Sequence, residues 1–167
     1  LINIGLFELE SIGYNLAKNI TSKGFKIYAY EKNLNIIEKI KHDRIQNLSL
    51  VKSLKQLTYE VPSPRIIMLS LPVDKIDECI DQIIEFMKPE DILADLGNSL
   101  YLKSIERHNR LLDKNISFLG IGVSGGPSGA RNGPAIMAGG TENAWIKTSH
   151  IFNAISAKNG EENACCY

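Results

Sequence analysis

Short apolar runs alternate along this chain with longer segments in which apolar residues recur every third or fourth position. Runs of the first kind are typical of strands buried on both faces, and segments of the second kind are typical of amphipathic helices. The apolar runs predict strands at Asn3–Phe7, Lys26–Tyr30, Ile66–Leu71, Ile92–Asp95 and Ser117–Ile121. Strands that alternate with helices predict βαβ units, and therefore a doubly wound, mostly parallel sheet in an α/β fold.

The helical segments have recognisable ends. Ser11 is suited to cap the first helix, and Pro89 stops the second. The predicted helices cover Ile12–Ile20, Ile76–Met87, Tyr101–Leu112 and Ala144–Ile155. Residues 41–53 are polar and irregular, and the polar tail at 158–163 is predicted to be loose.

The composition is that of an ordinary globular protein, with 44% apolar and 23% charged residues in a chain of 167. Equal numbers of basic and acidic residues, 19 of each, give no net charge, so neither nucleic acid nor membrane is an expected partner. The apolar runs are too short to span a bilayer, and the N-terminus carries no signal-peptide pattern. Cys79, Cys165 and Cys166 form neither a disulfide framework nor a zinc spacing. We therefore expect a cytoplasmic protein without a metal site.

The turn after the first predicted strand is a candidate phosphate site. A dinucleotide-binding βαβ unit needs small residues here, because backbone N–H groups must approach a pyrophosphate. If Gly13 takes the third glycine position, which allows close packing of helix and strand, Glu8 and Glu10 stand at the first two. The motif is then broken, and the alternative is a turn that binds nothing.

The end of the second predicted strand reads Glu31-Lys32-Asn33. An acid at this position favours a ribose with a free 2′-hydroxyl, and a cation favours a 2′-phosphate. Because both are present, Lys32 is predicted to contact a 2′-phosphate that Glu31 opposes, with weak discrimination between NADP and NAD. The alternative is a solvated surface pair.

Two segments in the second half carry further candidates. The glycine-rich stretch from Gly120 to Pro134 follows a strand and could present backbone N–H groups to an anion; otherwise it is a flexible surface loop. Asn98 follows another strand and could contact a ligand, cap the next helix, or do both. Three histidines lie in polar or amphipathic stretches without metal spacing and are predicted at the surface: His42, His108 and His150.

Four segments together resemble one enzyme family. Asp95–Ser99 is similar to its D-G-G-N-S segment, with Leu96 in place of one glycine, and Gly122–Pro134 matches G-V-S-G-G-x-x-G-A-R-x-G-P in full. Met137–Gly140 matches M-x-G-G, and Ala164–Tyr167 is similar to P-C-C-D-W. On these motifs, which extend over essentially the whole chain, the sequence resembles 6-phosphogluconate dehydrogenase, the decarboxylating NADP enzyme of the pentose phosphate pathway.

The resemblance implies that residues 1–167 are a single Rossmann-type dinucleotide-binding domain. The cofactor positions that it implies are Glu8, Leu9, Glu10, Ser11, Ile12, Gly13, Glu31, Lys32, Asn33, Ser70, Leu71, Pro72 and Asn98. The positions that it implies for a sugar-acid phosphate substrate are Asn98, Ser124, Gly125 and Gly126. The substrate positions keep the family's residues, whereas nearly all cofactor positions are changed. Weak or lost NADP binding is therefore expected.

The family's catalytic lysine and glutamate lie on a helix after the Cys-Cys segment, and this sequence ends at Tyr167. The resemblance therefore implies no catalytic residue within the chain, no activity of the chain alone, and a homodimer only if a C-terminal helical domain exists. Two interpretations stay open: a domain of an oxidoreductase that oxidatively decarboxylates 6-phosphogluconate, or a non-catalytic relative that serves as a binding or interaction module.

Overall fold

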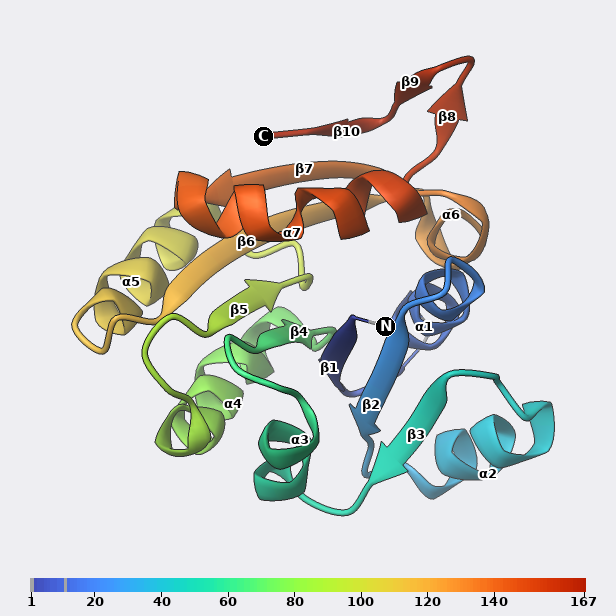
Figure 1. The fold of residues 1–167 in the computed structure, drawn as a ribbon, viewed down its shortest axis with the longest axis horizontal. Coiled ribbons are helices and arrows are strands. Elements are labelled where there is room, and N and C mark those ends of the chain that lie inside the picture. Colours follow the sequence, from blue (N-terminus) through green and yellow to red (C-terminus); the bar gives the residue numbers. More distant parts are fainter. Residues whose placement is uncertain (1, 11) are drawn as a thin grey trace.

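A computed structural model describes residues 2–10 and 12–167, so the predicted cap Ser11 lies outside the described residues. Within them, eight strands form one sheet in the order β10-β7-β6-β5-β4-β1-β2-β3 (Figure 1). The sheet contains β1 (Asn3–Phe7), β2 (Lys26–Tyr30), β3 (Leu48–Val51), β4 (Ile66–Leu69), β5 (Ile92–Asp95), β6 (Ser117–Ser124), β7 (Ala135–Gly140) and β10 (Cys165–Cys166). Two further strands, β8 (Lys158–Asn159) and β9 (Glu162–Asn163), form a separate two-stranded sheet. Neighbouring strands from β1 to β6 are all parallel, and β7 is antiparallel to β6. The predicted doubly wound, Rossmann-type sheet is confirmed.

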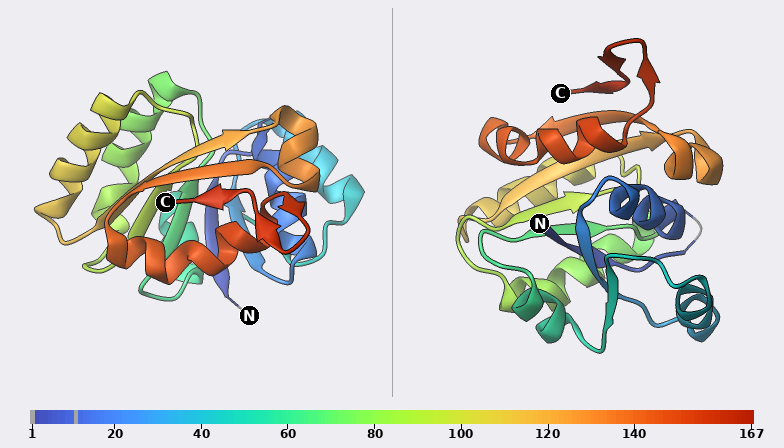
Figure 2. Two further views of the ribbon diagram at one scale, coloured as in Figure 1. Left: turned by 90° about the horizontal axis from the view of Figure 1, so that it is seen from above. Right: turned by 45° about the vertical axis from the view of Figure 1, so that its right-hand side comes forward.

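Helices cover both faces of this sheet. They are α1 (Ile12–Ser22), α2 (Leu34–Asp43), α3 (Leu54–Glu60), α4 (Ile76–Ile83), α5 (Tyr101–Leu112), α6 (Gly126–Asn132) and α7 (Glu142–Ile155), with short 3₁₀ turns η1 (Val73–Lys75) and η2 (Ile84–Phe86). One apolar cluster joins α1, α2, α6 and α7 to the sheet, and a second joins α3, α4 and α5 to its other face. Figure 2 shows α4 and α5 on one side and α1 and α2 on the other.

The two clusters explain why the strand sequences are continuously apolar. Ile4 and Leu6 of β1 point into the cluster under α1, whereas Phe7 belongs to the opposite cluster. Likewise, Ile67 and Leu69 of β4 face α3 and α4, and all four residues of that strand are buried. Burial on both faces removes the polar alternation of a half-exposed strand.

The segment expected to be irregular contains β3, and α2 and α3 flank it. The apolar residues of α2 gave no clear helical pattern, because only Ile40 is buried, while Ile36 and Ile37 are half-buried and Leu34 is exposed. The starts of α2 and α3 carry polar caps: the side chain of Asn33 accepts from the N–H of Asn35, and that of Ser53 accepts from the N–H of Gln56.

Other boundaries also differ from the prediction. β4 ends at Leu69 rather than at residue 71, and β6 extends to Ser124 because it pairs with β7. The glycine-rich segment is therefore no continuous loop; it contains the end of β6 and all of α6, and β7 begins directly after it.

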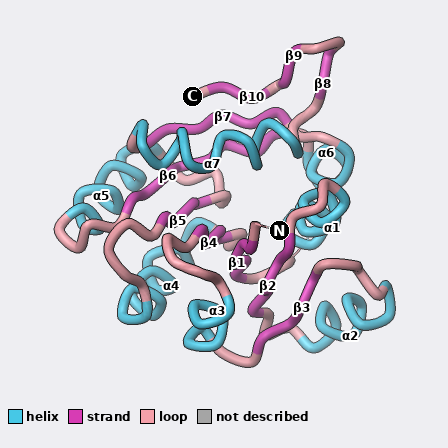
Figure 3. Tube along the Cα trace, in the orientation of Figure 1, coloured by secondary structure: helices cyan, strands magenta, loops and turns pink. Residues whose placement is uncertain are grey.

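The tail predicted to be loose is ordered. β8 and β9 form a hairpin, and β10 adds to the edge of β7 (Figure 3). The ring of Tyr167 stacks on Trp145 at 5.5 Å between centroids, and its hydroxyl donates to the carbonyl of Gly140 at 2.9 Å. In the described part of the chain, no helix is long and apolar enough to cross a membrane.

Gly140 at the end of β7 gives a test of this edge. Its φ is +147°, and an added Cβ would overlap the carbonyl oxygen of Phe118, whereas a Cβ at Gly139 would meet nothing within 4 Å. We predict that Gly140→Ala lowers the free energy of unfolding by about 3 kcal/mol or more, while Gly139→Ala changes it little. Urea unfolding followed by circular dichroism measures both, and equal effects would contradict the register.

Candidate functional site

The sheet has its switch point between β1 and β4, which lead to helices on opposite faces. Ligands of open α/β sheets bind outside the carboxyl ends of the strands at such a point. A cavity of about 340 Å³ lies there. The residues that line it include Phe7, Glu8, Glu10, Lys32, Leu71 and Pro72.

Gly13 brings α1 close to this edge. A Cβ at this position would lie 2.8 Å from the carbonyl oxygen of Glu8 and 2.7 Å from the hydroxyl of Ser70. No side chain fits between the helix, the turn and the end of β4. The close packing expected of the third glycine is thereby confirmed for Gly13.

Glu8 stands at the first glycine position of the turn and has the left-handed backbone that glycine would adopt, with φ +58°. Its N–H donates to the carbonyl of Tyr30 at 2.9 Å. Burial raises the pKa of Glu8 above its ordinary value, and the negative charge of Glu31 raises this pKa further. Residue 8 therefore has a glycine-like backbone but carries a partly buried carboxylate.

Glu31 is not the solvated surface residue that one interpretation proposed. The residue is 5% exposed, and its carboxylate accepts three backbone N–H groups. Oε2 accepts from Leu9, and Oε1 accepts from Lys32 and Asn33, each at 2.7 Å. The charge is therefore satisfied by the backbone of two separate segments, which the fold brings together.

The neighbours of Glu31 have different environments. Lys32 is exposed, and its ammonium lies 5.8 Å from the ring centroid of Phe7 and 5.9 Å from that of Tyr30. Asn33 uses its side chain to cap α2. Of the three residues at this strand end, Lys32 alone is among those that line the cavity.

Some of the remaining cofactor candidates line the cavity, and others pack beside the turn. Glu10 is exposed, and its carbonyl accepts from the N–H of Gly13. Ile12 packs against the apolar core, and Ser70 lies beside Gly13. Leu71 and Pro72 line the cavity together with Glu8 and Lys32. Ser11, a further candidate, lies outside the described residues.

Asn98 connects the end of β5 with the end of β6, on the other side of the switch point. Its Nδ2 donates to the carbonyl of Val123 at 3.3 Å, and its Oδ1 accepts from the N–H of Val123 at 2.9 Å. The predicted helix-cap role is wrong, because α5 is preceded by Leu100 and its N-terminus has no side-chain cap. Asn98 instead holds the loop after β5 against β6, directly before Ser124.

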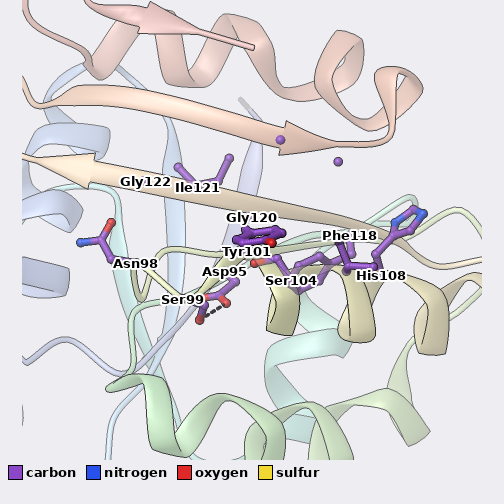
Figure 4. A pocket seen from close by; sticks show the side chains of 13 residues that line it. Asp95, Asn98, Ser99, Tyr101, Ser104, His108, Phe118, Gly120, Ile121 and Gly122 are labelled. Carbon is purple, nitrogen blue, oxygen red and sulfur yellow. Dashed lines mark hydrogen bonds between the residues drawn. The ribbon is translucent and has the colours of Figure 1, made fainter.

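A buried ion-pair network supports this loop. The carboxylate of Asp95 accepts from the N–H of Gly97, the hydroxyl of Ser99 and the guanidinium of Arg107, at 2.7–2.9 Å (Figure 4 draws the Ser99 bond). Arg107 also forms two hydrogen bonds to Asp77 and thereby lowers the pKa of that carboxyl. Arg107 belongs to no recognisable sequence motif, although an arginine on the inner face of a helix is a weak signal for a buried carboxylate partner.

The predicted substrate residues lie where β6 meets α6. Ser124 ends the strand and is exposed, and Gly125 and Gly126 begin the helix. The Asn98–Val123 pair therefore brings Asn98 next to this loop, while the turn at Glu8 lies across the switch point.

A larger cavity of about 580 Å³ lies between α5, β6 and β7 (Figure 4). Phe118, Ile121 and Ile105 contribute apolar walls. His108 also lines it; the residue is half-buried, and its Nδ1 has no hydrogen-bond partner among the described residues. His42 and His150 are exposed, as predicted. No group of His, Cys, Asp or Glu in the described part of the chain could hold a metal ion.

Comparisons with known proteins agree with this geometry. Residues 3–167 match a family model described as the NAD binding domain of 6-phosphogluconate dehydrogenase. The decarboxylating 6-phosphogluconate dehydrogenase of Haemophilus influenzae is 36% identical over 98% of this chain and 34% of its own length. The chain spans about a third of the length of such curated relatives.

Solved structures give the same result. A 6-phosphogluconate dehydrogenase of Plasmodium falciparum, described in its apo form, with NADP+ and with its substrate 6-phosphogluconate, has a TM-score of 0.92 and 33% identity. The match covers 99% of this chain and 36% of that one. A 3-hydroxyisobutyrate dehydrogenase of Mycobacterium tuberculosis, at 17% identity and a TM-score of 0.83, shares the fold.

The raised pKa of Glu8 predicts a pH-dependent penalty. A carboxyl whose pKa is higher in the folded state than in the unfolded state is costly while ionised, and the cost falls as the pH drops through the raised pKa. Relative to the parent chain, Glu8→Gln should increase the free energy of unfolding near pH 7, by under about 1 kcal/mol because the side chain is only partly buried. This gain should vanish below the ordinary pKa of 4.5.

Urea unfolding across this pH range measures the gain. The exposed Glu161→Gln is the control, with the same change of charge. A gain for Glu8→Gln that does not depend on pH would contradict the role assigned to its charge.

Proposed function

Because the chain belongs to the family of 6-phosphogluconate dehydrogenase NAD-binding domains, we propose that residues 1–167 serve as the single dinucleotide-binding domain of an oxidoreductase. The family resemblance predicted from the motifs is confirmed, and the cofactor class is a nicotinamide dinucleotide. The proposed reaction is the oxidative decarboxylation of 6-phosphogluconate, a sugar-acid phosphate.

The observation that carries this proposal is the pair of hydrogen bonds between Asn98 and Val123. These bonds hold Asn98 beside Ser124, at strand ends that adjoin the switch point. Asn98 and Ser124, which the family resemblance assigns to substrate, lie at or just after the carboxyl ends of β5 and β6, in the same sheet as β1, whose end carries the cavity beside Glu8. Because the residues that the family resemblance assigns to substrate are retained, an enzyme domain is favoured over a non-catalytic module.

The cavity beside Glu8 fits the adenosine end of a dinucleotide. Leu71 and Pro72 offer apolar surface to a base, and Gly13 keeps α1 close to the turn. Asn98 would then be a residue that could contact the nicotinamide end. When bound, the cofactor accepts hydride from the substrate; the residues described here bind and orient the two molecules.

The same cavity weakens the binding of NADP. The carboxylates of Glu8 and Glu10 line it, where a dinucleotide would place its phosphates. A carboxylate about 4 Å from a phosphate charge costs on the order of 4 kcal/mol at an effective dielectric near 20. Screening by water reduces this cost at the exposed Glu10 and less at the partly buried Glu8.

Substrate binding tests the proposed function directly. We predict that titration of the isotope-labelled chain with 6-phosphogluconate shifts the amide NMR signals of Asn98, Ser124, Gly125 and Gly126. Ser124→Ala should weaken these shifts, because it removes a hydroxyl from the exposed strand end. Ser149→Ala on α7 is the control. Shifts located elsewhere, or none, would refute the substrate assignment.

Measuring the affinity for a dinucleotide tests whether the carboxylates of the turn weaken binding. We predict that the double change Glu8→Gly and Glu10→Gly raises the affinity for NADP at least about tenfold, because two carboxylates leave the phosphate region. Isothermal titration calorimetry measures this affinity. The matched control replaces the exposed Glu161 and Glu162 with glycine. Unchanged affinity in the double variant of the turn would mean that both carboxylates play no part in binding.

A further inference from the structure

The backbone of Asn98 has a left-handed conformation, with φ +54°. Asparagine tolerates this conformation better than most residues, but it persists only where the surrounding contacts maintain it. From this backbone the side chain reaches β6 and bonds to both backbone groups of Val123. Because Oδ1 faces an N–H and Nδ2 faces a carbonyl, a rotation of the amide by half a turn would break both bonds. The orientation of the Asn98 amide is therefore fixed.

These two bonds leave part of the amide free for a ligand. An amide nitrogen carries two donors, and an amide oxygen has two acceptor positions. Among the described residues Val123 uses one of each, so one donor and one acceptor of Asn98 remain. Asn98 is among the residues that line the larger cavity. A displacement of the backbone at residue 98 would therefore move both free groups away from a ligand.

The carboxylate of Asp95 holds the chain on both sides of Asn98. Its Oδ1 accepts from the N–H of Gly97, the residue before Asn98, at 2.8 Å. Its Oδ2 accepts from the hydroxyl of Ser99, the residue after Asn98, at 2.7 Å. Since one carboxylate bonds to both neighbours, the position of Asn98 depends on where that carboxylate is held.

Arg107 on α5 determines the position of this carboxylate. Its Nη1 donates to Oδ2 of Asp95 at 2.9 Å and to the hydroxyl of Ser99 at 2.6 Å. Its Nε and Nη2 donate to the two carboxylate oxygens of Asp77 on α4, at 2.7 and 3.0 Å. The planar guanidinium thus connects the loop at Asn98 to two helices.

Arg107 itself has no direct access to a ligand at the strand ends. The residue is 2% exposed, and it is not among the residues that line the larger cavity or the cavity beside Glu8. Asp95 and Ser99, which it holds, do line the larger cavity. An effect of Arg107 on a ligand must therefore pass through the loop.

We infer that Arg107 is a positioning residue for substrate binding: through Asp95 and Ser99 it holds Asn98 in the conformation from which the Asn98 amide meets the sugar-acid phosphate. The inference rests on the proposed function and extends it to a buried residue that no motif assigned.

The variant Arg107→Lys separates positioning from charge. A lysine keeps the positive charge that compensates the buried Asp95, so the field at an anionic ligand changes little. An ammonium is a point charge, however, and lacks the planar fork that reaches Asp77 and Asp95 together. The loop should therefore lose its anchor while the net charge stays the same.

Nuclear magnetic resonance of the isotope-labelled chain tests the anchor without a ligand, because the side-chain amide of Asn98 gives its own signals. In the unchanged chain, the Nδ2 proton bonded to Val123 should exchange slowly with water. Arg107→Lys should accelerate this exchange at least about tenfold, because the loop opens more often. The matched control is Arg110→Lys on the same helix, whose exposed ion pair also joins α5 to α4 through Asp81. It should leave the Asn98 signals unchanged.

Titration with 6-phosphogluconate adds the binding readout, at a temperature where circular dichroism shows every variant to be folded. Arg107→Lys should weaken binding by about tenfold, the worth of one hydrogen bond to the ligand. Arg110→Lys should bind as the unchanged chain does.

A second variant keeps the result clear if Arg107→Lys does not fold. Asp77→Asn weakens the outer anchor of the guanidinium at a side chain that is 51% exposed, so the fold should tolerate it. It should accelerate the Asn98 exchange in the same direction, whereas Asp81→Asn on the same helix should not.

The outcomes separate the inference from the proposed function. A folded Arg107→Lys with lower stability but unchanged Asn98 exchange or unchanged affinity would show a purely structural role for Arg107. That result would overturn the inference and leave the proposed function standing. Failure of the unchanged chain to bind 6-phosphogluconate would overturn both.

Discussion

Helix α1 and the end of β4 meet at Gly13, where any side chain would collide with the carbonyl of Glu8 and the hydroxyl of Ser70. This close approach fixes the turn between β1 and α1, and the rest of the cofactor edge depends on it. So tight a turn gives residue 8 a left-handed backbone, which costs a glutamate about 1 kcal/mol or more. The hydrogen bonds from Glu8 to Tyr30 and from Leu9 to Glu31 offset that cost. The fold can therefore tolerate a glutamate at a glycine position, although the ligand then meets an additional charge.

The substrate half of the edge depends on a different network. Arg107 and Asp95 are both about 2% exposed or less, and a buried ion pair is stable only when its remaining hydrogen bonds are satisfied. Asp77, Ser99 and the N–H of Gly97 complete it. The network around Arg107 and the contacts of the turn at Glu8 have no residue in common. Changes in the turn can therefore alter cofactor binding while the loop that holds Asn98 keeps its shape, which agrees with a chain whose substrate motifs are intact and whose turn is not.

The limits of the sequence prediction follow from the same contacts. β1, β2 and β5 were predicted with their observed bounds, because burial on both faces leaves a continuous apolar run. α2 was missed because Ile40 is its only buried residue, and α6 because a glycine-rich helix has no apolar period. The candidate residues around the cavity were found through the family motif. The burial of Glu31 could not be found in this way, since two of its donors are adjacent in sequence but the third, Leu9, is brought to it only by the pairing of β1 with β2.

The backbone donors of Glu31 also explain why its charge is hard to remove by substitutions at other residues. A carboxylate held by a lysine or arginine loses its partner when that side chain is replaced. The partners of Glu31 are backbone N–H groups, which every residue except proline supplies. Substitutions at positions 9, 32 and 33 therefore leave the anion in place, and only a change at residue 31 itself can remove it. One residue thus stabilises the turn and, by its charge, opposes a second anion at the same place.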